Sequence, residues 1–183
     1  MPNCLTDRTP ILGTPAPALY CPPVNTCTDD CWPKLESLLN RYGLTLVRVG
    51  DGEVIPGSYW GEPEAGLVGH SVYARTDTPV HSVLHEACHV ICMDVDRRKH
   101  LHTDAGGEYA EENAVCYLEI VLAESIGISV PSICADMDGW GYTFRLGSAF
   151  VWFTNDAQDA HRWLLGHRLI TESGSPVFQL RAA

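Results

Sequence analysis

The chain has 183 residues, enough for one domain with a substantial core, and 45% of them are apolar against 19% charged, which is a globular composition. Twelve basic and 23 acidic side chains give a net charge of −11, which argues against a nucleic-acid partner because phosphate backbones are bound by basic surface. No stretch approaches the ~18 apolar residues of a membrane span, and residues 1–23 lack the basic and apolar regions of a secretory signal. We therefore expect a cytoplasmic protein with no membrane attachment.

Residues 1–31 differ in composition from the rest and predict an arm that precedes a single domain over residues 32–183. The arm holds six of the 12 prolines and four of the eight cysteines, which are Cys4, Cys21, Cys27 and Cys31. Disulfides are not expected without an export signal. The spacing contains no Cys-x-x-Cys pair, which favours plain thiols over a second, structural zinc ion held by these cysteines.

Apolar periodicity and turn residues divide the first half of the domain into four elements. They predict a helix at 32–43, a strand at 44–49 and, after a loop rich in glycine and proline, a strand at 67–75. Thr78 and Pro79 then begin a long helix that is expected to end near Val95.

The second half continues with a polar connection at 96–107 and a second long helix from Glu108 to Ile126. The last third predicts a strand within 136–153 and a helix at 155–167 that is capped by Asn155. This order of elements predicts an α+β fold, with a small, mostly antiparallel sheet packed on two long helices.

The segment His85-Glu86-Ala87-Cys88-His89 lies inside the first long helix. Residues four apart on a helix lie on one face, so both imidazoles can reach a single metal ion. Glu86 is rotated by about 100° from His85 and lies beside the pair, where it can act as a base on a metal-bound water. A chance match is the alternative, because the chain contains eight histidines.

A catalytic zinc ion takes three protein ligands and leaves one position for water, so a third ligand is required. Metzincins carry a glycine and a third histidine at the positions of Cys92 and Val95, which excludes that subclass. The polar connection offers three candidates, His100, His102 and Asp104.

The next helix offers Glu111, which lies within the apolar arc of the helical wheel. A carboxylate there must be paired or bind a metal, so Glu111 is the expected third ligand, with Arg97 or Arg98 as the alternative partner. The face that is expected to be solvated carries three further acids, Glu108, Glu112 and Glu119. Glu108 or Glu112 would replace Glu111 if the register of the helix differs.

Together these residues resemble the gluzincin branch of the zinc metallopeptidases, in which His-Glu-x-x-His is followed by a glutamate on a later helix. The segment "EENAVC" is similar to the Glu-Ala-Asn-x-Phe-Ala segment of the ImmA/IrrE-type peptidases and matches it at Glu111 and Asn113. "EENA" also fits the Glu-x-x-Ala of HtpX-type gluzincins. The resemblance covers residues 65–125; Glu112 replaces the usual alanine, and the Leu-Leu-x-Pro ending is missing.

The resemblance implies a zincin-like fold and a zinc-dependent hydrolase, most specifically a metallopeptidase with a peptide or protein substrate. His85, His89 and Glu111 would hold one catalytic zinc ion, and Glu86 would serve as the general base. The strand at 67–75 would lie along the cleft, where an extended peptide can pair with its edge.

The donor that stabilises the tetrahedral oxyanion is expected to be Tyr142, in the segment "DGWGYTF", with His161 and His167 as alternatives. The remaining histidines near the motif, His70 and His81, are expected at the surface or as support for the ligands. Three tryptophans are assigned to the core, Trp140, Trp152 and Trp163.

Two other functions fit the same sequence. One is a catalytically silent zincin-like module that binds or senses a partner. The other is an inhibited enzyme, in which a cysteine of the arm caps the zinc ion.

Overall fold

The computed structural model describes residues 24–58, 61 and 63–182, so most of the expected arm, including Cys4 and Cys21, lies outside it. The described chain has an α+β architecture with seven helices and one three-stranded sheet. The elements in chain order are α1 (Trp32–Asn40), β1 (Thr45–Arg48), β2 (Gly66–Val68), β3 (Ser71–Ala74), α2 (Val80–Cys92), α3 (Val95–Lys99), α4 (Tyr109–Ser125), α5 (Val130–Trp140), α6 (Ala149–Asn155) and α7 (Gln158–Gly166). None of these helices is long and apolar enough to cross a membrane.

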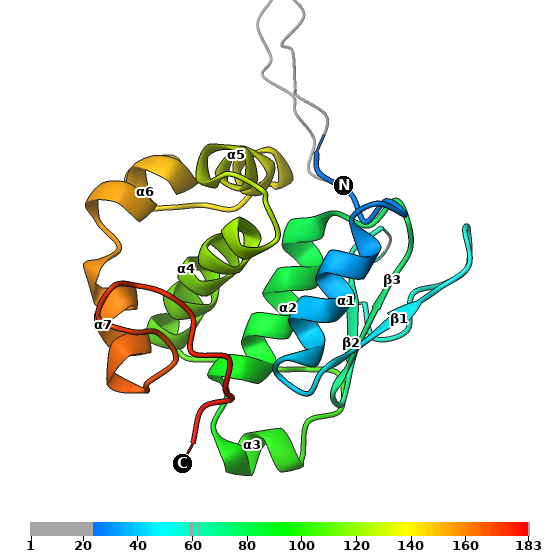
Figure 1. Ribbon diagram of the computed structural model, residues 1–183, viewed down its shortest axis with the longest axis horizontal. Coiled ribbons are helices and arrows are strands. Elements are labelled where there is room, and N and C mark those ends of the chain that lie inside the picture. Colours follow the sequence, from blue (N-terminus) through cyan, green and yellow to red (C-terminus); the bar gives the residue numbers. More distant parts are fainter. Residues whose placement is uncertain (1–23, 59–60, 62, 183) are drawn as a thin grey trace, which may run out of the picture.

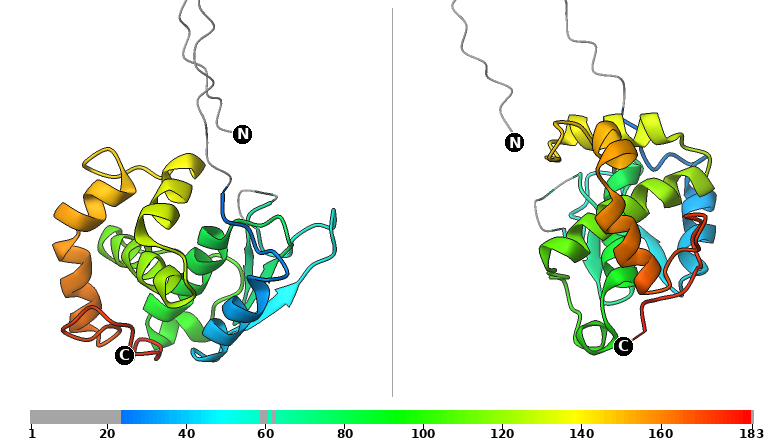
Figure 2. Two further views of the ribbon diagram at one scale, coloured as in Figure 1. Left: turned by 45° about the horizontal axis from the view of Figure 1, so that its top comes forward. Right: turned by 90° about the vertical axis from the view of Figure 1, so that its left-hand side faces the viewer.

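Helices α2 and α4 form the centre of the molecule (Figures 1 and 2). α2 packs between the sheet and α4, while α5 and α7 pack on α4, and α6 lies against α5. Eleven of the 13 residues of α2 are buried, and the two that are not are His85 and Glu86. The core therefore encloses α2 on every side except the one that carries the start of the motif.

The sheet is mixed, whereas a mostly antiparallel one was expected. β3 lies in the middle of the order β1-β3-β2 and pairs in parallel with β1 and antiparallel with β2. The strand expected at 67–75 is a hairpin of β2 and β3, because Gly69 turns the chain with φ 59° and donates its N–H to His102 O at 2.9 Å. Since β3 has a strand on each side, it has no free edge for an extended peptide.

The outer edge of β2 is covered by the segment that precedes it. Leu67 donates its N–H to Gly57 O at 3.4 Å. Gly66 faces this segment so closely that a β-carbon at Gly66 would lie 2.0 Å from Pro56 O. Only glycine at position 66 permits this approach, which protects the edge strand from pairing with another chain.

The strand expected within 136–153 is replaced by the end of α5, a turn and α6. Gly141 ends α5 in a left-handed conformation, with φ 100°. Ser148 then caps α6, because its Oγ accepts the Val151 N–H at 3.2 Å. The helix expected to start at Asn155 begins at Gln158, because Asn155 is still the last residue of α6.

The C-terminal end of α2 is held by two arginines. α2 ends at Cys92, before the expected Val95, and Asp94 starts the short helix α3 inside the expected polar connection. Arg98 of α3 and Arg181 of the C-terminal segment together donate to four carbonyl oxygens at 2.7–3.2 Å, those of Val90, Ile91, Cys92 and Met93. Guanidinium groups thus satisfy three of these carbonyl groups at the helix end, which also suits the helix dipole, and the backbone N–H of Arg181 satisfies the fourth, that of Ile91.

The described end of the arm, residues 24–31, packs on the domain. Asn25 Nδ2 donates to Ser132 Oγ at 2.9 Å and to Asp136 Oδ2 at 2.6 Å, which joins this segment to α5. Cys27 is buried and Cys31 is half-buried, and both are free thiols. The alternative of a zinc site at the arm cysteines stays a prediction, because its other two members lie outside the described residues.

Replacing Gly66 with alanine is expected to lower the free energy of unfolding by about 2–3 kcal/mol, because the new methyl group overlaps the Pro56 carbonyl. Gly166 is the matched control, since a β-carbon there would meet no atom within 4 Å. Gly166→Ala should leave stability unchanged or raise it by up to about 1 kcal/mol. Urea denaturation measures both values, and equal stabilities of the two variants would contradict the close approach.

Candidate metal centre

Helix α2 presents three histidines at a spacing of four residues, and the last two form the candidate site. The side chains of His85 and His89 are 16% and 11% exposed, so each is mostly enclosed by protein. Their Nε2 atoms face one another at 3.1 Å. The expected convergence of the two imidazoles on one point is therefore present.

Glu112 of α4 completes the set of converging atoms. Its Oε1 lies 3.4 Å from His85 Nε2, and its Oε2 lies 3.7 Å from His89 Nε2. Ligand atoms that each lie ~2.0–2.1 Å from a tetrahedral zinc ion are separated by about 3.3–3.4 Å. The three donor atoms thus have the chemistry and nearly the spacing that one zinc ion requires.

Glu119 binds the Nδ1 side of the His85 ring, and the Nε2 side faces His89 and Glu112. The side chain of Glu119 is fully buried, and its Oε2 lies 2.7 Å from His85 Nδ1. Burial opposes protonation of His85, but its neighbours, Glu119 among them, raise the pKa of His85 well above its ordinary value. A carboxylate that accepts the Nδ1–H leaves Nε2 as the nitrogen that would give up its proton to bind a metal ion. Glu119 was expected on a solvated face of the helix, and its burial shows that this prediction is wrong. The signal that it missed is the spacing of Glu112, Cys116 and Glu119, which puts all three on the α4 face opposite His85.

A second group of donor atoms, from His85, Cys116 and Glu119, lies within 4.8 Å of one another. The 2.7 Å between His85 Nδ1 and Glu119 Oε2 is a hydrogen-bond distance and is too short for two ligands of the same ion. The second group therefore serves to hold His85, and the Nε2 side of the ring is the side on which a metal ion could be bound.

Glu111, the expected third ligand, does not reach the histidines. Arg97 Nη1 donates to both of its carboxylate oxygens at 2.7 and 2.9 Å, and Arg181 Nη1 donates to Oε2 at 3.2 Å. Arg97 is thus the alternative partner that the sequence offered. Of the two alternatives that a different register allowed, Glu112 is the one that lies at the histidines, because a shift of one residue turns the side chain by about 100° around α4.

The candidates in the connection before α4 make local contacts instead. His100 Nδ1 lies 2.9 Å from Asp96 O, and Asp104 Oδ1 accepts the Gly106 N–H at 3.0 Å. His102 contributes its carbonyl oxygen to the turn at Gly69. Glu108 is exposed and precedes the first residue of α4.

Glu86 is half-buried beside the ligands. Burial raises the pKa of Glu86 to about 7, with His85 opposing the shift and Glu64 and Glu112 adding to it. A carboxylate whose pKa lies near neutrality is suited to accept a proton and return it. Its proximity to the histidines agrees with the expected role of base.

Tyr142 lies against the first ligand, although it comes from the turn after α5. Its ring is perpendicular to that of His85, with the centroids 5.5 Å apart. Burial raises the pKa of Tyr142 well above its ordinary value, so the phenol stays protonated and able to donate. The alternatives lie elsewhere: His161 packs on Tyr117, and His167 packs on Trp163.

His81 was expected at the surface or as support for the ligands, and it does not lie at the surface. It is fully buried, and neither ring nitrogen has a hydrogen-bond partner in the described part of the chain. Burial lowers the pKa of His81 to about 3, so the ring stays neutral between Trp140 and Tyr142. His70, in contrast, is exposed in the hairpin turn.

The three tryptophans assigned to the core differ in burial. Trp152 is buried, whereas Trp140 and Trp163 are half-buried. Trp140 donates its Nε1–H to Glu64 at 2.8 Å and thereby joins α5 to the loop before β2.

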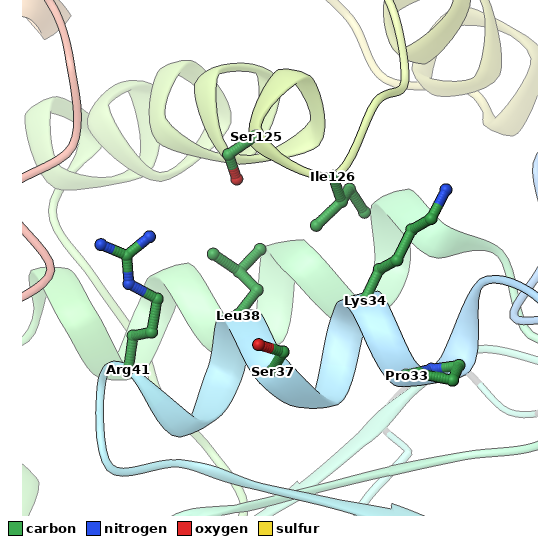
Figure 3. Close-up of a pocket in the computed structure, with 7 residues that line it drawn as sticks. All are labelled: Pro33, Lys34, Ser37, Leu38, Arg41, Ser125 and Ile126. Atoms are coloured by element: carbon green, nitrogen blue, oxygen red, sulfur yellow. The ribbon is translucent and has the colours of Figure 1, made fainter.

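Two hollows lie outside the histidine pair. One, of about 470 Å³, separates α1 from the end of α4 and is lined by Leu38, Ile126 and the cations Lys34 and Arg41 (Figure 3). The other, of about 400 Å³, is lined by Trp163 and by the cluster of Glu111 with Arg97 and Arg181. The first is remote in the fold from the metal-facing nitrogens, and the second adjoins the centre through α4.

No family model matches the chain, and neither a curated protein nor a solved structure matches it.

Glu112→Gln is expected to weaken zinc binding by at least ~100-fold, because it removes the charged third donor. Glu124→Gln, at an exposed position of the same helix, should leave binding unchanged. Zinc content per chain and chelator competition measure both. Full zinc binding by Glu112→Gln would remove Glu112 from the centre.

Proposed function

We propose that the protein is a zinc-dependent hydrolase, and specifically a metallopeptidase. The observation that carries the proposal is the convergence of His85 Nε2, His89 Nε2 and the Glu112 carboxylate, with Glu119 buried behind His85. Two helices from different parts of the chain contribute these groups. The approach of the Glu112 carboxylate to the two histidines is therefore independent of the sequence motif, which lies on α2 alone.

Zinc suits this donor set better than the common hard cations. Two imidazole nitrogens and one carboxylate are typical of catalytic zinc sites, while magnesium and calcium select oxygen ligands. Burial and the neighbouring His85 lower the pKa of His89 to about 4, so its ring is neutral and can act as a ligand at physiological pH. Three protein ligands leave a fourth position for a water or a substrate oxygen.

Glu86 supplies the proton transfers in the proposed reaction. A zinc ion in this site would activate a water by lowering its pKa from about 15.7 toward 7 and would polarise the substrate carbonyl. Glu86 accepts the proton that the attacking water loses while the new C–O bond forms and gives the tetrahedral state. It then passes this proton to the amine nitrogen, and the C–N bond breaks as the amine leaves. Burial raises the pKa of Glu86 to about 7, which allows this carboxyl group both to accept and to return a proton.

Tyr142 is the proposed donor to the oxygen that gains charge during the attack. Its protonated phenol lies over the ring of His85, on the same side of α2 as the ligands. A preformed donor stabilises the tetrahedral state without reorganisation of solvent.

The covered strand edges favour a second candidate, a zincin-like module that binds metal and a partner without hydrolysis. β3 is paired on both sides, and residues 56–58 cover β2 at Leu67. An extended peptide therefore cannot bind to β3 as expected from the resemblance, and it would reach β2 only by displacing that segment. A metallopeptidase with this arrangement must hold its substrate by side chains around the centre.

Glu86→Gln separates the two candidates. The variant is expected to bind one zinc ion with wild-type affinity and to lose hydrolysis of mixed peptides by ~10²–10⁴-fold, because the base is absent. Mass spectrometry of the peptides, with and without chelator, measures cleavage, and a His85→Ala/His89→Ala variant gives the metal-free baseline. Unchanged cleavage by Glu86→Gln would refute this mechanism. Wild-type protein that binds zinc and cleaves nothing would favour the binding module.

Tyr142→Phe tests the oxyanion donor. The phenylalanine keeps the ring contact with His85 and removes the hydroxyl, so kcat should fall by ~10²–10³-fold while KM and zinc affinity stay close to wild type. A fall in zinc affinity instead would show that Tyr142 supports the ligand rather than the transition state.

A further inference from the structure

Adjacent glutamates on α4 have different partners. A pair of arginines binds Glu111, and the histidines of α2 face Glu112. Glu111 is 7% exposed and bound by Arg97 and Arg181, while Glu112 is 44% exposed and lies at the two Nε2 atoms. The two carboxylates remain close to each other. A β-carbon at Gly107 would lie 3.5 Å from Glu111 Oε1 and 3.7 Å from Glu112 Oε2. Both therefore pass the same backbone position on their way to different partners.

Both terminal nitrogens of Arg97 form hydrogen bonds in this arrangement. Its Nη1 bonds both oxygens of Glu111, and its Nη2 bonds the carbonyl oxygens of Ala105 and Gly106 at 2.6 and 2.7 Å. One terminal nitrogen of the guanidinium group thus binds the carboxylate and the other binds the connection, and the rigid plane of the group fixes their relative position, which a flexible ammonium does not do. Arg97 thus fixes Glu111 relative to the connection that leads into α4.

Arg181 joins the same carboxylate to the zinc-binding helix. It lies 70 residues after Glu111 in the sequence and bonds Glu111 Oε2 and Cys92 O through a single nitrogen, Nη1, at 3.2 Å each. Its guanidinium also lies over the ring of Trp163, 5.1 Å from the centroid. Since Cys92 ends α2 and Glu111 lies in the first turn of α4, Arg181 joins the two helices that supply all three proposed ligands.

We propose that Arg181, together with Arg97, is a positioning residue for the metal centre that holds Glu111 away from the histidines and leaves Glu112 as the third ligand. The inference rests on the proposed zinc site and deepens it, because it makes zinc affinity depend on the docking of the C-terminal segment. Without Arg181, Glu111 is a buried carboxylate that has lost one of its two cations, next to a ligand of the same charge. Repulsion between the two carboxylates, or movement of Glu111 toward the metal, then disturbs the site.

The test compares zinc dissociation constants of the full-length protein and its variants, measured by competition with a chromophoric chelator. Arg181→Ala is expected to weaken zinc binding by ~10–100-fold, the usual effect of removing a group that orients a ligand. Arg162→Ala is the matched control, because this exposed arginine on α7 forms no ion pair in the described part of the chain. Its zinc affinity should equal that of the wild type.

The decisive variant is Arg181→Ala/Glu111→Gln. If Arg181 acts by neutralising and restraining Glu111, removing the charge of Glu111 should recover most of the affinity that Arg181→Ala loses. If Arg181 acts only by capping α2 at Cys92, the double variant should bind zinc as weakly as Arg181→Ala or more weakly, and the inference is overturned. Arg181→Gln, which removes the charge and keeps a hydrogen-bond donor, should weaken zinc binding as Arg181→Ala does and replaces it if that variant does not fold.

Thermal denaturation of the metal-free variants separates positioning from stability. A lower Tm of Arg181→Ala with an unchanged zinc dissociation constant would assign Arg181 a structural role alone and overturn the inference. That result would leave the proposed function intact. Wild-type protein that binds no zinc would overturn the proposed function, and this inference with it.

Discussion

The hydrogen bond between Glu119 and His85 is the interaction on which the rest of the candidate site depends. It joins α4 to α2 through a fully buried carboxylate, which is costly to enclose unless it is paired. The 2.7 Å contact fixes the distance between the two helices at this level. It also leaves Nε2 as the nitrogen of His85 that faces His89 and Glu112. Every other group of the centre is placed relative to that ring: His89 one turn along α2, Glu112 two turns back along α4, and Tyr142 against its face.

A second group of charged side chains joins the same pair of helices at the opposite end of the site. Arg98 and Arg181 satisfy the last carbonyl groups of α2, and Arg181 and Arg97 satisfy Glu111 at the beginning of α4. α2 and α4 are thus joined at one level by a carboxylate and an imidazole and at another by a carboxylate and two guanidinium groups. These two polar contacts add to the apolar packing of α2 on α4 and fix the side chains of the two helices relative to each other at two levels.

The sequence predicted the parts of this arrangement that depend on local spacing. The helix that carries His85, Glu86 and His89 and the long helix from Glu108 follow from residues close together in the chain. The contact of Tyr142 with His85 agrees with the expectation, but it joins distant segments and does not follow from local spacing. The proposed third ligand did not follow, because α4 is apolar around most of its circumference and a wheel cannot choose between adjacent glutamates. The residue that binds Glu111 and to which we attribute this choice, Arg181, lies 70 residues away in the sequence. Glu119 was missed for the same reason, since only the partner helix distinguishes a buried carboxylate from a solvated one. In the last third, Ser148 starts a helix where apolar residues alone suggested a strand.

The arrangement of the sheet constrains what such a centre can act on. β3 leads directly into α2 and is the strand nearest to the motif in the sequence, yet it is paired on both sides. The remaining edge near α2 belongs to β2, which is three residues long and is approached by Gly57. Backbone pairing would supply affinity independent of sequence, so a substrate that cannot use it must be recognised through its side chains or its chain ends. Around the proposed ligands these contacts can come from Glu64, Trp140 and Tyr142, which lie on the loop before β2 and at the end of α5. If the protein is a peptidase, its selectivity therefore resides in these two segments rather than in the sheet.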